Sequence, residues 1–392
     1  MTLFFIFFST IVISSIVINN NLKKQRINCF AKQRFSSLAG HYTYCFILWS
    51  LVLFLILLAT NLIFFTKILL ILTIIVVNFF LIKFLFKKNF NAKKHFEKFQ
   101  IGVLSITAGI GILITLIITI SILFESLRFF EIVSFKEFFF GLTWNPQMAI
   151  TAEQEVGASS FGIVPVFLGT MLITLVAMAV AVPIGIMSAI YLGMYANPKT
   201  RDILKPVLEI LAGVPTVVYG YFAVTTIAPF FKNFFNSFGV EMSAESALSA
   251  GFVMGVMIIP FVLSLTDDAI ASVPQSLKDG ALALGSTKSE MIKKVVLVSA
   301  MPTIIGAIIL AVSRAIGETM IVVMSAGLVA KLSFNPLDSV TTATAQIVTL
   351  LVGDQEFNSP KTLSAFALAL TLFVFTFAFN VVALMVMKKY KR

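Results

Sequence analysis

The stretch RAIGETM, Arg314 to Met320, places a cation and an anion inside an otherwise apolar run from about Thr303 to Val329. A helix of about 27 residues is about 40 Å long at 1.5 Å per residue, which is enough to cross a bilayer with some tilt. A charged side chain near the middle of such a span costs about 2.5–3.5 kcal/mol on insertion scales. Arg314 and Glu318 are four residues apart and would share one face of a continuous helix. The stretch therefore predicts either a path for an anion or a structural ion pair.

The composition places the whole chain in a membrane. Of its 392 residues, 59% are hydrophobic and only 12% are charged, whereas soluble domains carry about 25% charge. The formal net charge of +11 resembles a nucleic-acid signal, but the lysines and arginines gather in short loops between apolar runs, as the positive-inside rule requires. The two cysteines and two histidines form no disulfide framework and no metal-ligand cluster. We expect an all-α polytopic membrane protein without a metal site, a cofactor or a nucleic-acid partner.

Apolar runs divide the chain into two predicted parts. Residues 1–98 are expected to be an N-terminal membrane extension of about three helices, and residues 99–392 a transmembrane domain of six spans. The three helices are expected at 3–18, 44–65 and 68–86, and the six spans at 101–124, 162–192, 203–230, 247–266, 303–329 and 363–387.

Charge in the loops predicts the orientation. Placing the lysine-rich loop 87–100 in the cytoplasm also gathers most other lysines and arginines on that side, as expected for a multi-pass protein of the cytoplasmic membrane. This orientation puts the N-terminus outside and the C-terminus, together with loop 267–302, in the cytoplasm. The mildly acidic loops 125–161 and 330–362 then lie outside, where they are either docking surfaces or solvated loops.

Small residues and a proline mark two of the six spans. Gly251 and Gly255 form a GxxxG pair, which lets helices approach closely inside a bundle. Gly213 and Pro215, followed by Tyr219, lie within the third span, and Pro215 removes a backbone hydrogen bond. We expect a kink there, either purely mechanical or with a role in gating.

The cytoplasmic loop 267–302 has the pattern of two short amphipathic helices. Apolar and polar residues alternate at helical spacing, and Gly285 permits a turn between the helices. Such a helix pair is either a dock for a partner's groove or an interfacial helix on lipid. Gly280 to Thr287 imitates the spacing of a phosphate-binding P-loop but has Ser286 in place of the required lysine, so we expect no ATP site in this chain.

This loop resembles the "EAA" loop of ABC-transporter permease subunits. The family's Glu-Ala-Ala and following glycine correspond to Asp279, Gly280, Ala281 and, after Leu284, Gly285. The family's usual proline would fall at Val298, so the exit from the second helix departs from the pattern. The resemblance implies that the loop receives ATP-binding subunits.

Three further stretches narrow the resemblance to phosphate-specific ABC permeases of the PstC type. They are Trp144-Asn145-Pro146, AGVPTVVYG at 212–220 and RAIGETM itself, and the resemblance covers about residues 100–392. It implies the six-helix core of a type I importer, with no enzymatic activity of its own. The implied partners are a PstA-type permease, PstB-type ATP-binding subunits, a periplasmic phosphate-binding protein, membrane lipid and phosphate. The implied substrate path contains Arg314 and Glu318, with Thr319 beside them.

Other functions stay open at this stage. A permease for sulfate, molybdate or phosphonate would share the loop but should lack the GETM ending. A secondary transporter typically shows repeated halves, and we find no convincing repeat. A membrane scaffold or sensor would leave the charge within the membrane unexplained.

Overall fold

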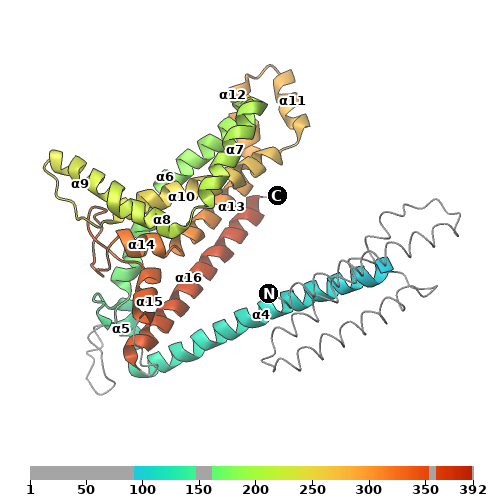
Figure 1. The fold of residues 1–392 in the computed structure, drawn as a ribbon. Coiled ribbons are helices and arrows are strands. Elements are labelled where there is room, and N and C mark those ends of the chain that lie inside the picture. Colours follow the sequence, from blue (N-terminus) through green and yellow to red (C-terminus); the bar gives the residue numbers. More distant parts are fainter. Residues whose placement is uncertain (1–91, 147–160, 353–358, 391–392) are drawn as a thin grey trace, which may run out of the picture. The chain divides into compact units, whose positions relative to one another are not determined.

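The computed structural model describes residues 92–146, 161–352 and 359–390, and these fold mainly into helices (Figure 1). Five of the described helices or helix runs are long and apolar enough to cross a membrane, and the count is six if one bent helix pair is taken as a single span. The prediction of an all-α membrane protein with a core of six spans is therefore confirmed. The helices predicted at 3–18, 44–65 and 68–86 lie outside the described residues.

The helices have the following bounds. The long spans are α4 (Ala92–Ile132), α6 with its π-helical end η3 (Val164–Ile190, Tyr191–Tyr195), α10 (Ala247–Ala271), the run α12–η5–α13 (Lys288–Met291, Ile292–Val296, Leu297–Ile316) and α16 (Pro360–Tyr390). The bent pair joins α7 (Pro198–Ala212) to the run α8–η4–α9 (Thr216–Phe222, Ala223–Ile227, Ala228–Ser237). Shorter helices are α5 (Phe135–Phe140), α11 (Gln275–Ala283), α14 (Met320–Ser325) and α15 (Ala343–Leu351).

Contacts divide the chain into two compact units, Met1–Ile117 and Ile118–Arg392. The predicted boundary at residue 98 lies within α4, and a separate extension over residues 1–98 stays a prediction. All the predicted site residues belong to the second unit.

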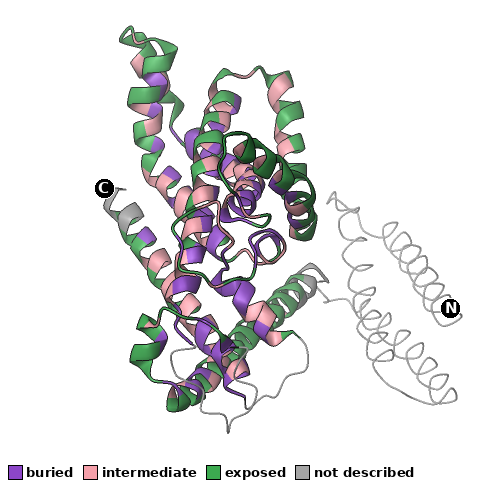
Figure 2. Ribbon diagram, turned by 90° about the vertical axis from the view of Figure 1, so that its left-hand side faces the viewer, coloured by how far each residue is buried: buried purple, intermediate pink, exposed green. Residues whose placement is uncertain are grey.

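Close packing of α6 on α10 forms the centre of the second unit. A Cβ atom added at Gly251 would lie 2.8 Å from the Cβ of Val176, and one added at Gly255 would lie 2.7 Å from the backbone oxygen of Ala177. Only glycine permits these approaches, so the packing role predicted for this pair is confirmed. Figure 2 shows the buried residues gathered along the inner faces of the bundle.

Two predicted spans are interrupted. The span expected at 203–230 bends by 87° between Ala212 and Thr216. The continuous helix expected at 303–329 is wrong, because α13 ends at Ile316 and α14 begins only at Met320.

In the predicted coupling loop 267–302, the non-membrane segment is shorter than expected, because both flanking helices extend into it. The predicted loop begins inside α10, which continues to Ala271, and it ends inside the helix run that starts at Lys288. Only α11 and its flanking turns, between Ser272 and Thr287, project from the two long helices.

Candidate functional site

The two helix interruptions lie close together because α8 packs against α14. A Cβ atom added at Gly220 of α8 would lie 2.9 Å from the sulfur of Met324 and 3.3 Å from the Cα of Ile321. A larger residue at position 220 would require the Met324 side chain to move and the backbone of α14 to shift slightly. The ends of two broken spans therefore meet inside one bundle, an arrangement that leaves helix-terminal backbone groups available within the membrane.

Gly213, Pro215 and Tyr219, predicted to kink the third span, all lie at its bend. Pro215 is the N-cap of α8 and has extended backbone, while Gly213 caps the end of α7. The hydroxyl of Tyr219 donates a 2.8 Å hydrogen bond back across the bend to the carbonyl of Leu211. Pro215 has no N–H to donate to this carbonyl, which instead accepts from Tyr219 and, at 3.3 Å, from the backbone amide of Val214. A role of these residues in gating stays a prediction.

Arg314 lies in the last turn of α13 with an exposed side chain. Its guanidinium carbon is 5.5 Å from the centre of the Phe261 ring on α10, within the range of a cation–π interaction. No described residue accepts a hydrogen bond from the guanidinium or forms an ion pair with it. All its N–H donors thus remain available to an anion.

The structure does not place Arg314 and Glu318 one turn apart on a single helix. Gly317, a poor helix former, caps α13, and the Glu318 amide donates to the carbonyl of Ala315 rather than to that of Arg314. The chain then leaves the helix, so the geometry needed for an i,i+4 pair is lost. The structural ion pair considered from the sequence is absent among the described residues.

The break after α13 is supported from α15. Thr344, which is buried, donates a 2.7 Å hydrogen bond from its hydroxyl to the backbone carbonyl of Glu318. Thr319, the third predicted path residue, donates from its hydroxyl to the carbonyl of Gly317 at 3.3 Å. Both hydroxyls stabilise backbone that is not in a regular helix.

The sequence reasoning missed two of these neighbours. Thr344 belongs to the polar segment Ser339–Gln346, and hydroxyl and amide side chains inside an apolar region are a recognisable signal. Phe261 has no such signal, because a phenylalanine in a membrane helix is ordinary.

The predicted coupling residues lie together on α11 and the turn that follows it. Asp279 accepts a 3.0 Å hydrogen bond from the side-chain amide of Gln275, and Gly280 has open space around its Cβ position. Leu284 is 92% exposed, and Gly285 has a φ of +83°, which favours glycine. A capping box between Thr287 and Glu290 then starts the next helix. The motif therefore places a solvent-exposed leucine on a turn whose backbone conformation is fixed by Gly285.

A buried carboxylate joins α7 to the end of α10. Asp267, with a side chain only 3% exposed, accepts hydrogen bonds from Arg201 at 2.8 and 3.1 Å and from Lys205 at 2.9 Å. The element before the bend is thus fixed to the helix that leads into α11.

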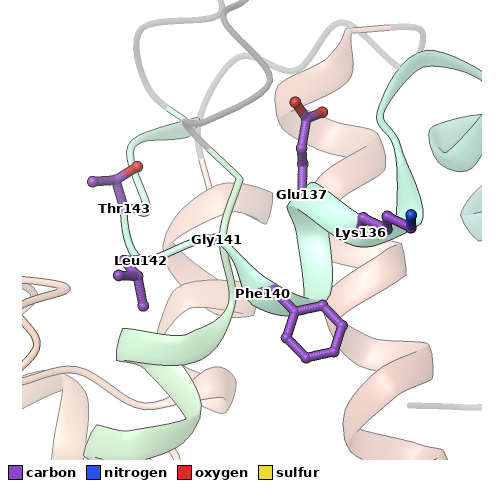
Figure 3. Close-up of a pocket in the computed structure, with 6 residues that line it drawn as sticks. All are labelled: Lys136, Glu137, Phe140, Gly141, Leu142 and Thr143. Carbon is purple, nitrogen blue, oxygen red and sulfur yellow. The ribbon is translucent and has the colours of Figure 1, made fainter.

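Two hollows flank the segment that follows α5. One, of about 340 Å³, is lined by residues 136–137 and 140–143 and contains one lysine and one glutamate (Figure 3). The other, of about 390 Å³, lies between residues 142–146 and 328–330 and reaches Gln346 and Thr349. Its wall is fixed by a buried 3.0 Å hydrogen bond from the Trp144 indole to Gln346. The described residues include no group of three or more histidine, cysteine or acidic side chains that could hold a metal ion.

Comparison with known proteins defines the class. The chain belongs to the family of binding-protein-dependent transport system inner membrane components, whose model matches residues 181–392. It is therefore a multi-pass transport subunit with the fold of a type I ABC importer permease.

Individual relatives narrow the comparison. The chain is 34% identical over 238 residues to the "Probable ABC transporter permease protein YqgH" of Bacillus subtilis (strain 168), covering 61% of this chain and 73% of that relative. It is 33% identical over 225 residues to the "Phosphate transport system permease protein PstC" of Xylella fastidiosa (strain 9a5c), covering 54% and 66% respectively. It is 30% identical over 259 residues to the "Phosphate transport system permease protein PstC 1" of Mycobacterium bovis (strain ATCC BAA-935 / AF2122/97), covering 59% and 76%.

Proposed function

We propose that this chain is the permease subunit of an ATP-driven importer that moves inorganic phosphate across the cytoplasmic membrane. The observation that carries the proposal is Arg314, an unpaired cation at the end of a broken membrane helix, in a chain whose relatives include phosphate permeases. A buried or lipid-facing arginine without an ion partner is costly, and such a residue normally marks a path for an ion.

The chemistry of the three path residues suits a tetrahedral oxyanion. The Arg314 guanidinium is always charged and offers N–H donors in a planar fork that binds two oxygens at once. Thr319, beside the break, adds a hydroxyl. The Glu318 carboxylate repels an anion. We therefore assign it the role of lowering the affinity of the Arg314 site for phosphate, so that phosphate can leave.

The coupling motif supports an ATPase on separate subunits. We assign the docking of ATP-binding subunits to α11, Leu284 and Gly285, because an exposed leucine on a fixed turn fits an apolar groove on a partner. Movement of α11 would reach α10 directly, and through Asp267 it would reach α7 and the bend at Gly213–Pro215. That chain of contacts can rock the bundle between outward-open and inward-open states.

The remaining partners follow from this assignment. A second permease subunit completes the path within the lipid bilayer, and a periplasmic phosphate-binding protein delivers substrate to the outside loops. The C-terminus and α11 lie in the cytoplasm, as the loop charges predict.

Uptake of labelled phosphate into cells that carry the full transporter tests the substrate. Unlabelled phosphate should compete fully, whereas equal concentrations of sulfate, molybdate or phosphonate should compete weakly. Stronger competition by one of those three anions would transfer the assignment to that anion. Uptake that persists when the ATP-binding subunit is inactivated would indicate a secondary transporter instead.

A further inference from the structure

The Phe261 side chain occupies a place in the structure that no motif predicted. It follows Pro260 in the middle of α10 and packs, partly buried, against the central cluster of buried residues around Met257 and Ile258. Its ring is therefore held by the core of the bundle, while its face meets the Arg314 guanidinium at 5.5 Å.

An aromatic face holds a cation in a different way from a carboxylate. The ring attracts the charge through its quadrupole and needs none of the guanidinium N–H donors. A carboxylate partner would occupy two of those donors with a bidentate pair. Among the described residues Arg314 has the ring and no hydrogen-bond acceptor, so its orientation is restrained while all its donors stay available.

We infer that Phe261 is a positioning residue for the anion site, restraining the Arg314 guanidinium in the orientation that receives the substrate. The inference rests on the proposed function, since it concerns the same anion and the same arginine. Restraining a flexible side chain before binding lowers the entropic cost of binding. The ring should therefore act on substrate affinity more than on the rate of the transport cycle.

Phosphate uptake by the full transporter, measured over a range of phosphate concentrations, tests the inference. We expect Phe261→Leu and Phe261→Met to raise the KM by about 2- to 30-fold, the range that a cation–π interaction of ordinary strength gives. The maximal rate per assembled transporter should change by less than about 2-fold on the same scale. Phe261→Tyr keeps an aromatic face and should keep the KM of the wild type.

Phe252→Leu is the matched control. Phe252 is also on α10, but its ring packs at 5.3 Å against Phe231 and not against a cation. This change should leave the KM unaltered. An unchanged KM in both Phe261→Leu and Phe261→Met overturns the inference, as does an equal rise of the KM in Phe252→Leu or in Phe261→Tyr.

Arg314→Ala separates failure of this inference from failure of the proposed function. If Arg314→Ala abolishes uptake and the Phe261 variants keep the wild-type KM, the positioning role of Phe261 is refuted and the anion site at Arg314 stands. If Arg314→Ala transports phosphate normally, the proposed anion site falls, and the role of Phe261 falls with it.

Discussion

At the scale of single residues, the geometry around Arg314 differs from a stable ion pair. A pair with Glu318 would have neutralised both charges and left little for a substrate. The observed arrangement instead combines a guanidinium over an aromatic ring with a carboxylate on a separate, non-helical segment. Unpaired charges in a membrane are costly, and a transient anion in a transport path is a physical reason to retain them.

Thr344→Val should destabilise the break that separates these two charges. The change keeps the shape of the side chain but removes the donor to the Glu318 carbonyl and the 3.0 Å hydrogen bond to the Thr342 hydroxyl, and leaving a buried polar group unsatisfied costs about 1–3 kcal/mol. Thermal unfolding of the purified protein in detergent should therefore show a lower Tm. Thr344→Ser keeps the hydroxyl and should preserve the Tm.

Thr349→Val serves as the control for Thr344→Val, because the Thr349 hydroxyl donates only within α15, to Gln346. An equal loss of stability in the Thr349 and Thr344 variants would show that the bond to Glu318 has no special effect.

Asp338, in the loop after α14, gives a prediction about pH. Hydrogen bonds from Ser333 at 2.6 Å and from Lys331 at 3.1 Å hold the pKa of this carboxyl below its ordinary value of 3.8. A lowered folded-state pKa contributes stability at pH values above the unfolded-state pKa, and this contribution disappears as the pH falls through the folded-state pKa. Asp338→Asn should therefore lower the Tm at pH 7 and have a smaller effect at pH 3, which is below the ordinary pKa of the carboxyl.

The Ser333 hydroxyl provides the largest part of that pKa shift, so Ser333→Ala should weaken the pH dependence as well. A Tm difference between Asp338→Asn and the wild type that is the same at both pH values would contradict the assignment.

At the scale of elements, the proposed anion site lies where two membrane spans are interrupted, between α7 and α8 and between α13 and α14. The bend after α7 has two strong sequence signals, Gly213 and Pro215, and it was predicted as a kink, although not as a turn of 87°. The break after α13 has only Gly317, and an isolated glycine in an apolar run is a weak signal. The hydrogen bond from Thr344 that supports this break comes from a segment 26 residues further along the chain. Local pattern could not predict it.

The coupling motif yields a paired test on two glycines of one element. Gly280, inside α11, has open space around its Cβ position, so Gly280→Ala should stabilise the helix by about 0.5–1 kcal/mol. Gly285 has a φ of +83°, and Gly285→Ala should instead destabilise the turn, by about 1 kcal/mol or more.

Thermal unfolding of the two variants checks the sign of each effect. ATP-driven uptake should survive in Gly280→Ala, because nothing lies within contact distance of the added methyl group, and should fall in Gly285→Ala. Equal behaviour of the two variants would mean that α11 and its turn do not have the described backbone.

At the scale of the whole molecule, composition and small-residue spacing were sufficient to predict the membrane class, the approximate number of spans and the packing of the glycine pair in α10 against α6. These features depend on averages and on short spacings, both of which are visible in a sequence. The position of Phe261 against Arg314 depends on how two spans cross, and no spacing within either span specifies that crossing.

The orientation of the molecule is open to direct test by cysteine labelling. In a background with Cys29 and Cys45 replaced by serine, we would compare Leu284→Cys, at a position that is 92% exposed, with Phe334→Cys, at one that is 77% exposed. A membrane-impermeant thiol reagent should label position 334 in intact spheroplasts and position 284 only after permeabilisation. The reverse pattern would place α11 outside and would remove the docking of ATP-binding subunits.

The central claim is that Arg314 is the anion-binding point of a phosphate importer. Initial rates of labelled phosphate uptake, normalised to the amount of assembled transporter in the membrane, test it most directly in Arg314→Ala beside the wild type. We predict that uptake by Arg314→Ala falls to the background rate while assembly is unchanged, because the change removes the guanidinium to which we assign the binding of the anion. Uptake by Arg314→Ala at the wild-type rate and KM would contradict the claim.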